Sequence, residues 1–125
     1  IMASILRVNT LTDASSGNSV PMATVAQGSA KAWAGALGDG VPLNSFGFSS
    51  FVDNGTGDNT CNFTNAMTNI GYSATTSCED EASPANRLAT PYGKTTSLFK
   101  IESFIADSAG NSGASQNAVV HGDLA

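Results

Sequence analysis

A six-residue turn segment, residues 53–58 with the sequence DNGTGD, constrains the fold more than any other part of the chain. Glycine adopts positive φ at no steric cost, and Asp and Asn side chains hydrogen-bond the backbone of a turn, so this composition favours a tight hairpin connection. The flanking segments, residues 46–52 and 59–64, carry the aromatic and alternating apolar residues typical of strands. The sequence therefore predicts an antiparallel hairpin near its centre.

Short segments with β-branched or aromatic residues recur along the rest of the chain, and Gly, Asn, Ser and Pro separate them. Residues 23–36 have apolar residues near helical spacing, but Gly28 interrupts that spacing. We therefore expect an all-β fold: a small antiparallel β-sandwich of jelly-roll-like form with an extended N-terminal arm. The expected strands are residues 3–9, 29–34, 46–52, 59–64, 72–78, 98–105 and 118–121, and residues 79–94 are expected to form an exposed loop.

The first 28 residues differ in character from the remainder. They begin with a short apolar segment and continue into a polar, serine-rich stretch at residues 13–19, which cannot bury much surface by itself. We expect residues 1–28 to form an arm that is ordered by attachment or by contact with another subunit, and residues 29–125 to form the sandwich. The arm residues expected to contact a partner are Ile5, Leu6, Val8 and Leu11.

Length and charge narrow the classes of function. A chain of 125 residues forms one domain, and its large apolar side chains are spread thinly among small and polar residues, so we expect neighbouring subunits to complete the core of a homo-oligomer. The formal net charge of -5 makes nucleic acid an unsuitable partner. No stretch approaches the roughly 20 apolar residues of a membrane span. We expect no membrane insertion and no secretory signal.

Two cysteines, Cys61 and Cys78, are too few for a disulfide scaffold and lack the CxxC spacing of zinc and redox sites. If residues 59–64 and 72–78 were the two strands of a hairpin, Cys61 would lie roughly opposite Cys78, within reach of a disulfide. Buried free thiols are the alternative, because free cysteine behaves as a small apolar core residue. The sequence leaves both states open.

Groups that could support catalysis are sparse. The single histidine, His121, has Asp123 nearby, but no serine stands in the context of a nucleophile elbow. The acidic run at residues 79–81 offers oxygen ligands that suit Ca²⁺, yet a solvated charge run is the simpler interpretation, as a plain turn is for residues 53–58. Nothing places two carboxylates across a cleft, as glycoside hydrolysis requires. We predict no catalytic residue, no cofactor and no metal site.

Aromatic residues are expected mainly in the core. We expect Phe46 and Phe48 to share an inward strand face, and likewise Cys61 and Phe63. If any aromatic side chain is exposed, Trp33 and Tyr92 are the candidates for stacking on a sugar or contacting a protein partner.

Five segments of the chain form a recognisable series: residues 6–13 (LRVNTLTD), 27–33 (QGSAKAW), 49–58 (SSFVDNGTGD) and 62–67 (NFTNAM), and the closing Gly122-Asp123. Taken in order, they resemble a family of tail-fibre-type virion proteins found in marine bacteriophages and prophages. The similarity covers nearly the whole chain, although no single segment is diagnostic. It breaks at residues 34–44, where relatives tend to carry a longer polar strand, and at the last two residues.

The resemblance implies a structural protein on the exterior of the phage particle. It would be a tail-fibre-like appendage that attaches to other virion proteins, most plausibly as a homotrimer because related fibres are threefold, and that contacts a receptor or glycan on the host surface. A capsid decoration or head-fibre protein is the alternative location. A monomeric carbohydrate-binding or adhesin module is the alternative class of function.

Overall fold

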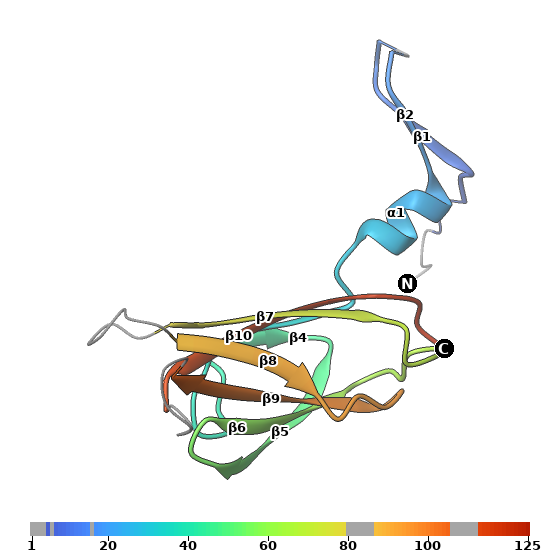
Figure 1. Ribbon diagram of the computed structural model, residues 1–125. Coiled ribbons are helices and arrows are strands. Elements are labelled where there is room, and N and C mark those ends of the chain that lie inside the picture. Colours follow the sequence, from blue (N-terminus) through green and yellow to red (C-terminus); the bar gives the residue numbers. More distant parts are fainter. Residues whose placement is uncertain (1–4, 6, 16, 80–86, 106–112) are drawn as a thin grey trace.

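The computed structural model describes residues 5, 7–15, 17–79, 87–105 and 113–125 and has the predicted small antiparallel β-sandwich, with an N-terminal arm that stands away from it (Figure 1). Two four-stranded sheets form the sandwich. The first sheet has the order β4-β3-β10-β7, with β3 at Ala32–Leu37, β4 at Asn44–Phe46, β7 at Ser73–Glu79 and β10 at Ser115–His121. The second has the order β5-β6-β9-β8, with β5 at Phe48–Gly55, β6 at Asp58–Phe63, β8 at Arg87–Tyr92 and β9 at Leu98–Ile105.

The chain passes between the sheets four times, and three consecutive pairs, β3–β4, β5–β6 and β8–β9, stay within one sheet. The β5–β6 connection is the turn predicted from residues 53–58, and Gly55 and Gly57 have the expected positive φ of 130° and 71°. The crossing from β4 to β5 depends on Gly47, whose φ is 76°. A Cβ at this position would overlap the Lys31 carbonyl oxygen, so glycine alone fits where the chain changes sheet.

The apolar core lies between the sheets, and its aromatic part is concentrated at one end. The Phe63 ring packs 5.5 Å from Phe48, 5.7 Å from Phe99 and 5.4 Å from Tyr72, measured between ring centroids. Such offset and edge-on pairs stabilise a core beyond the area they bury. Inward-facing Leu37, Met67, Ile101, Ala118 and Val120, among others, fill the remaining space.

A buried polar network crosses the sandwich at the other end of β6. Gln116 on β10 donates from Nε2 to the Gly57 carbonyl oxygen at 2.7 Å and to Ser103 Oγ at 3.0 Å, and its Oε1 accepts from Asn59 Nδ2 at 3.1 Å. Asn59 Oδ1 accepts in turn from the Gly40 amide at 2.8 Å. Because Gln116 belongs to the first sheet and Asn59 and Ser103 to the second, the network ties the two sheets together.

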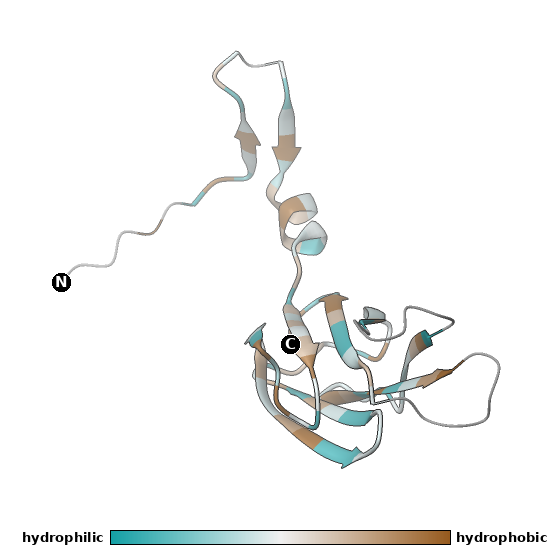
Figure 2. Ribbon diagram, turned by 90° about the vertical axis from the view of Figure 1, so that its left-hand side faces the viewer, coloured by the Kyte–Doolittle hydropathy of each residue, from teal (hydrophilic) through white to brown (hydrophobic). Residues whose placement is uncertain are grey.

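The arm consists of a two-stranded hairpin, β1 at Thr10–Thr12 and β2 at Ser19–Pro21, followed by the short helix α1 at Met22–Gly28. The hairpin lies farthest from the sandwich, and α1 lies between the two (Figure 2). The expected strand at residues 3–9 is wrong for its described part, because the first strand begins at Thr10. The helix was not predicted: it starts directly after Pro21, whose φ of -58° suits a helix start, and Gly28 ends it instead of interrupting it.

Three further expectations differ from the structure. Residues 46–52 form two strands in different sheets, so Phe46 and Phe48 do not share a face, and Phe46 is exposed. Within residues 79–94, which were expected to be a loop, β8 is a strand, since an edge strand tolerates a proline such as Pro91. The hairpin expected between the two cysteines is absent, because β6 pairs with β5 and β9 whereas β7 pairs with β10.

Candidate functional site

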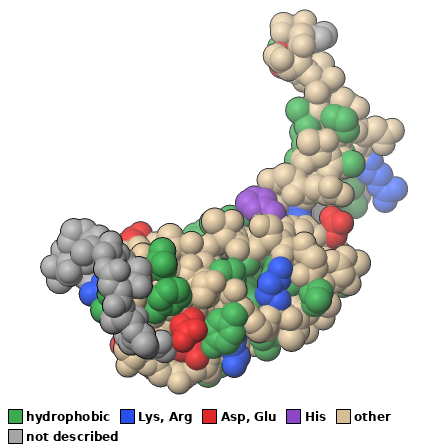
Figure 3. All heavy atoms as spheres, in the orientation of Figure 1, with side chains coloured by type: hydrophobic (Ala, Val, Ile, Leu, Met, Phe, Trp, Pro, Cys, Tyr) green, Lys and Arg blue, Asp and Glu red, His purple; other side chains and the backbone are tan. Residues whose placement is uncertain are grey.

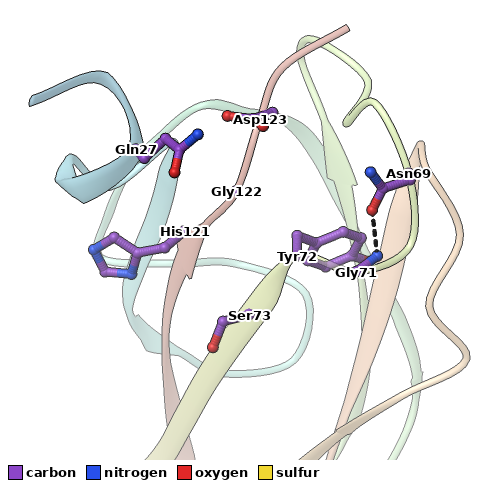
Figure 4. A pocket seen from close by; sticks show the side chains of 8 residues that line it. All are labelled: Gln27, Asn69, Gly71, Tyr72, Ser73, His121, Gly122 and Asp123. Carbon is purple, nitrogen blue, oxygen red and sulfur yellow. Dashed lines mark hydrogen bonds between the residues drawn. The ribbon is translucent and has the colours of Figure 1, made fainter. Parts of the chain in front are cut away.

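A pocket of about 340 Å³ lies where the arm meets the sandwich. Its walls come from the C-terminal end of α1, the loop before β7, the first residue of β7, and the end of β10 with the residues after it. In Figure 4, Gln27 and His121 lie on one side of Gly122, Tyr72 and Asn69 lie on the other, and Asp123 lies beyond. The space-filling view also places the histidine at the surface near the base of the arm (Figure 3).

Polar side chains in this pocket are largely unpaired. Among the described residues, the side chains of Gln27, Ser73, His121 and Asp123 have no hydrogen-bond partner. Asn69 accepts from the Gly71 amide at 2.7 Å through Oδ1, which leaves its NH₂ group to donate. Hydrogen-bonding groups that converge on a hollow without protein partners are what a polar ligand requires.

One wall of the pocket is held in place because Tyr72, which lines it, is buried in the core. The Tyr72 hydroxyl donates to the Leu98 carbonyl oxygen at 3.0 Å. The backbone carbonyl oxygen of Tyr72 accepts from Lys94 Nζ at 2.6 Å. The Lys94 ammonium lies 4.4 Å from the centroid of the Tyr72 ring, and burial raises the pKa of the phenol to about 12. Gly122 lies against this residue so closely that a Cβ there would come within 2.6 Å of Tyr72 Cβ.

The pocket adjoins a row of exposed apolar side chains on the outer face of the first sheet. Trp33 pairs in register with Phe46 on one side and with Val119 on the other. Their exposed fractions are 37% for Trp33, 57% for Phe46 and 38% for Val119. The neighbouring residues Ala32, Ala34, Ala118 and Val120 are buried, so strand alternation turns the row outward. We call these three residues, two aromatic and one aliphatic, the aromatic row.

The two predicted exposed aromatics differ in their surroundings. Trp33 is exposed, as expected, and belongs to the aromatic row. Tyr92 is half-buried on the second sheet, where its hydroxyl donates to Asp58 Oδ1 at 2.7 Å and Lys100 Nζ lies 5.7 Å from its ring centroid. Burial raises the pKa of Tyr92 to about 12, and the hydrogen bond and charge of Asp58 add to that shift. Tyr92 therefore stabilises the second sheet through these contacts and does not line the pocket.

Cys61 and Cys78 lie in different sheets and no disulfide joins them. Cys61 is fully buried on β6, and Phe63 shares its inward face as predicted. Burial raises the pKa of the Cys61 thiol to about 12, so it stays protonated and unreactive at neutral pH. The pairing geometry considered from the sequence fails because β6 and β7 are not neighbours in a sheet.

Of the predicted arm contacts, Ile5 and Leu11 are exposed and Val8 is half-buried, whereas Leu6 lies outside the described residues. Of the acidic run, Glu79 ends β7, and residues 80 and 81 lie outside the described part. No three His, Cys, Asp or Glu side chains in the described part of the chain gather into a group that could hold a metal ion. Among the same residues, no helix is long and apolar enough to cross a membrane.

Sequence reasoning named His121 and Asp123 but did not join them to Gln27, Asn69 or Ser73. The register of β10 with β7 sets His121 opposite Ser73, and that pairing cannot be seen in the sequence because the two strands are far apart along the chain. Gln27 reaches the site through a helix that was not predicted. In the sequence, only His121 and Asp123, the polar residues on either side of Gly122, pointed to this site.

No protein-family model matches the chain, and neither the curated proteins nor the solved structures include a match to it.

Proposed function

We propose that this chain is an oligomeric structural protein on the exterior of a bacteriophage particle. The arm attaches it to other virion proteins, and the sandwich projects outward as a tail-fibre-like appendage that meets the host surface. A homotrimer is the proposed assembly. The same architecture would suit a decoration protein on the capsid. Such a protein would sit at a different place on the particle but would use its arm for attachment in the same way.

The observation that carries this proposal is the arm. Ile5, Leu11 and Val20 are exposed, and α1 buries none of its residues. An isolated two-stranded hairpin is marginally stable in water, because it buries too little apolar surface to offset the entropy lost on ordering. An arm of this kind gains stability by packing its apolar side chains on a partner or on neighbouring copies.

The tip of the hairpin is nevertheless closely specified. Asp13 Oδ1 accepts from the Gly17 amide at 3.0 Å and Ser15 Oγ at 3.0 Å, and its Oδ2 accepts from Asn18 Nδ2 at 2.8 Å. The side-chain bond from Asn18, followed by the backbone bond from the same residue, holds the pKa of Asp13 below its ordinary value. The serine-rich stretch therefore forms a turn that its own side-chain hydrogen bonds hold in one conformation. An arm with a fixed conformation suits specific attachment better than a flexible linker does.

The resemblance also supports the proposal. Residues 6–13, quoted above as similar to tail-fibre-type proteins, include β1 and the turn-forming Asp13. Residues 49–58 contain most of β5 and the turn to β6. These two of the quoted segments thus fall on the arm and on the β5–β6 hairpin at one edge of the second sheet.

Removal of residues 1–28 tests the proposal. The shortened chain is expected to fold, because no residue of the apolar core lies in the arm, but to be absent from particles assembled in its presence. The matched control is Leu88→Ser in the full chain, which changes an exposed apolar residue of the sandwich and leaves incorporation intact. Particles that incorporate the shortened chain normally would refute the role of the arm. Light scattering of the full chain tests the trimer, and imaging of labelled particles separates tail from capsid.

A further inference from the structure

We propose that the outer face of the first sheet binds a neutral saccharide, which stacks on Trp33 and is hydrogen-bonded by the polar pocket beside it. The inference goes beyond the attachment role of the arm and does not depend on which particle carries the chain. It rests on two features described above that lie on one continuous surface: the aromatic row and the pocket.

The register of the first sheet makes the surface continuous. His121 lies two residues beyond Val119 on β10, so both side chains face outward and their Cα atoms are about 7 Å apart. Ser73 pairs with His121 across the strands, which brings their Cβ atoms to about 5 Å. A saccharide seated on Trp33, which pairs with Val119, would therefore extend toward His121 on the neighbouring strand, with Ser73 one strand farther on.

The chemistry of the two features fits a sugar. One face of a pyranose is lined by C–H groups, which pack on an aromatic ring, and its rim carries hydroxyls that both donate and accept hydrogen bonds. The pocket supplies both kinds of group: carboxylate and carboxamide oxygens accept, whereas the amides of Gln27 and Asn69 donate. These side chains of Gln27, Ser73, His121 and Asp123 have no partner within the described chain, so they can bond a ligand without breaking an existing contact.

The charges favour a neutral ligand over an anionic one. In the described part of the chain, two cations lie next to the site, and both are engaged within the chain. Lys31 Nζ donates to the Ala26 carbonyl oxygen and, at 3.0 Å, to Ser29 Oγ. Lys94 Nζ donates to the Tyr72 carbonyl oxygen at 2.6 Å. Asp123 contributes a carboxylate to the pocket, and the whole chain carries a net charge of -5. Phosphorylated, sulfated or sialylated saccharides would be repelled.

A second copy of the chain is the competing occupant of the aromatic row. A saccharide is favoured because the row continues into unpaired polar groups, whereas the contact core of a protein interface is depleted of such groups and leaves few of them without partners. The two occupants give different results in the experiment below, since only a contact between copies makes Trp33 a determinant of oligomeric state.

The experiment uses the full chain on an array of immobilised neutral hexose and N-acetylhexosamine oligosaccharides, with sulfated and sialylated ones beside them. The strongest neutral oligosaccharide is then titrated in solution while tryptophan fluorescence is followed. Trp33 is the single tryptophan, so stacking on it shifts the emission directly. Trp33→Ala is expected to weaken binding about tenfold or more, His121→Ala several-fold, and Trp33→Phe much less, because phenylalanine keeps a stacking face.

Leu88→Ala is the matched control, since Leu88 is an exposed apolar residue on the outer face of the other sheet and should leave affinity unchanged. Should Trp33→Ala fail to fold, His121→Ala and Ser73→Ala carry the test, because neither side chain is in the core. The proposal is overturned if no neutral oligosaccharide binds, if Trp33→Ala binds as tightly as the parent, or if that change alters the oligomeric state. Removal of residues 1–21 takes away the hairpin of the arm but keeps α1 and Gln27. Loss of particle incorporation in that variant, with saccharide binding retained, would separate this site from the proposed function.

Discussion

Replacing Gln116 by leucine tests how the two sheets are held together. Gln116 is fully buried, and its amide is the only group described that hydrogen-bonds Asn59 and Ser103 across the sandwich at once. Leucine has a similar volume, so the change removes hydrogen bonds without leaving a large cavity. It therefore isolates the polar contribution from the packing contribution.

The magnitude follows from the contacts. Three hydrogen bonds disappear, those to Gly57, Ser103 and Asn59, and each contributes about 1 kcal/mol net. Gly57 keeps a bond from the Ser103 amide at 2.8 Å, whereas Asn59 Nδ2 is left buried with no partner, which costs about 1–3 kcal/mol. The apolar gain from leucine offsets part of this. We expect the free energy of unfolding to fall by about 3 kcal/mol, a large share of the roughly 5–15 kcal/mol of an ordinary domain.

Urea denaturation followed by circular dichroism, at one fixed protein concentration, measures this change. Gln27→Leu is the control, because it makes the same replacement at an exposed glutamine and should shift stability by less than about 0.5 kcal/mol. Adding Asn59→Leu to Gln116→Leu removes the orphaned donor, so the double change should cost at least about 1 kcal/mol less than the sum of the single changes. A loss below about 1 kcal/mol for Gln116→Leu would refute the assigned role of the network.

Three other predictions concern single groups. Gly47→Ala should cost about 3 kcal/mol or more, because a positive φ and an overlap with backbone combine there, whereas Gly28→Ala, with open space around the new methyl group, should cost little in the same denaturation assay. In a Cys78→Ser variant, a thiol reagent at pH 8 should leave native Cys61 unlabelled until the chain unfolds; rapid labelling would contradict its burial. The two tyrosines, Tyr72 and Tyr92, should ionise near pH 12 instead of 10 in a spectrophotometric titration. Since their folded pKa values are raised, the stability linked to them is complete below pH 10 and is lost as the pH rises from 10 to 12, so ionisation of both at pH 10 would refute the assignment.

Local sequence signals located much of the sandwich. Residues 98–105 were expected as a strand and are β9, and the turn at residues 53–58 joins β5 and β6 as predicted. Turn chemistry and strand composition act over a few residues, so they can be read without knowledge of the partners. The same reasoning placed Cys61 and Phe63 on one inward face, where they are.

Errors arose where a long-range contact or one backbone angle decides the outcome. Gly47 divides an apolar run that would otherwise read as one strand, and its positive φ puts Phe46 outside and Phe48 toward the core. Strand β8 carries Pro91 and was expected as loop, because only the sheet order shows that it is an edge strand. The candidate site depends on the same kind of information, namely the pairing of β10 with both β3 and β7.

The two ends of the sandwich use different chemistry, and this bears on where a binding site can form. At the network end, the buried polar side chains of Asn59, Ser103 and Gln116 hydrogen-bond within the chain, so these three have no group to offer a ligand. At the aromatic end, the rings of Phe63 and Phe99 hold Tyr72 in place without using polar groups at the surface. The residues around Tyr72 are therefore fixed in position while their polar side chains stay unpaired, which is the combination that a preorganised site requires.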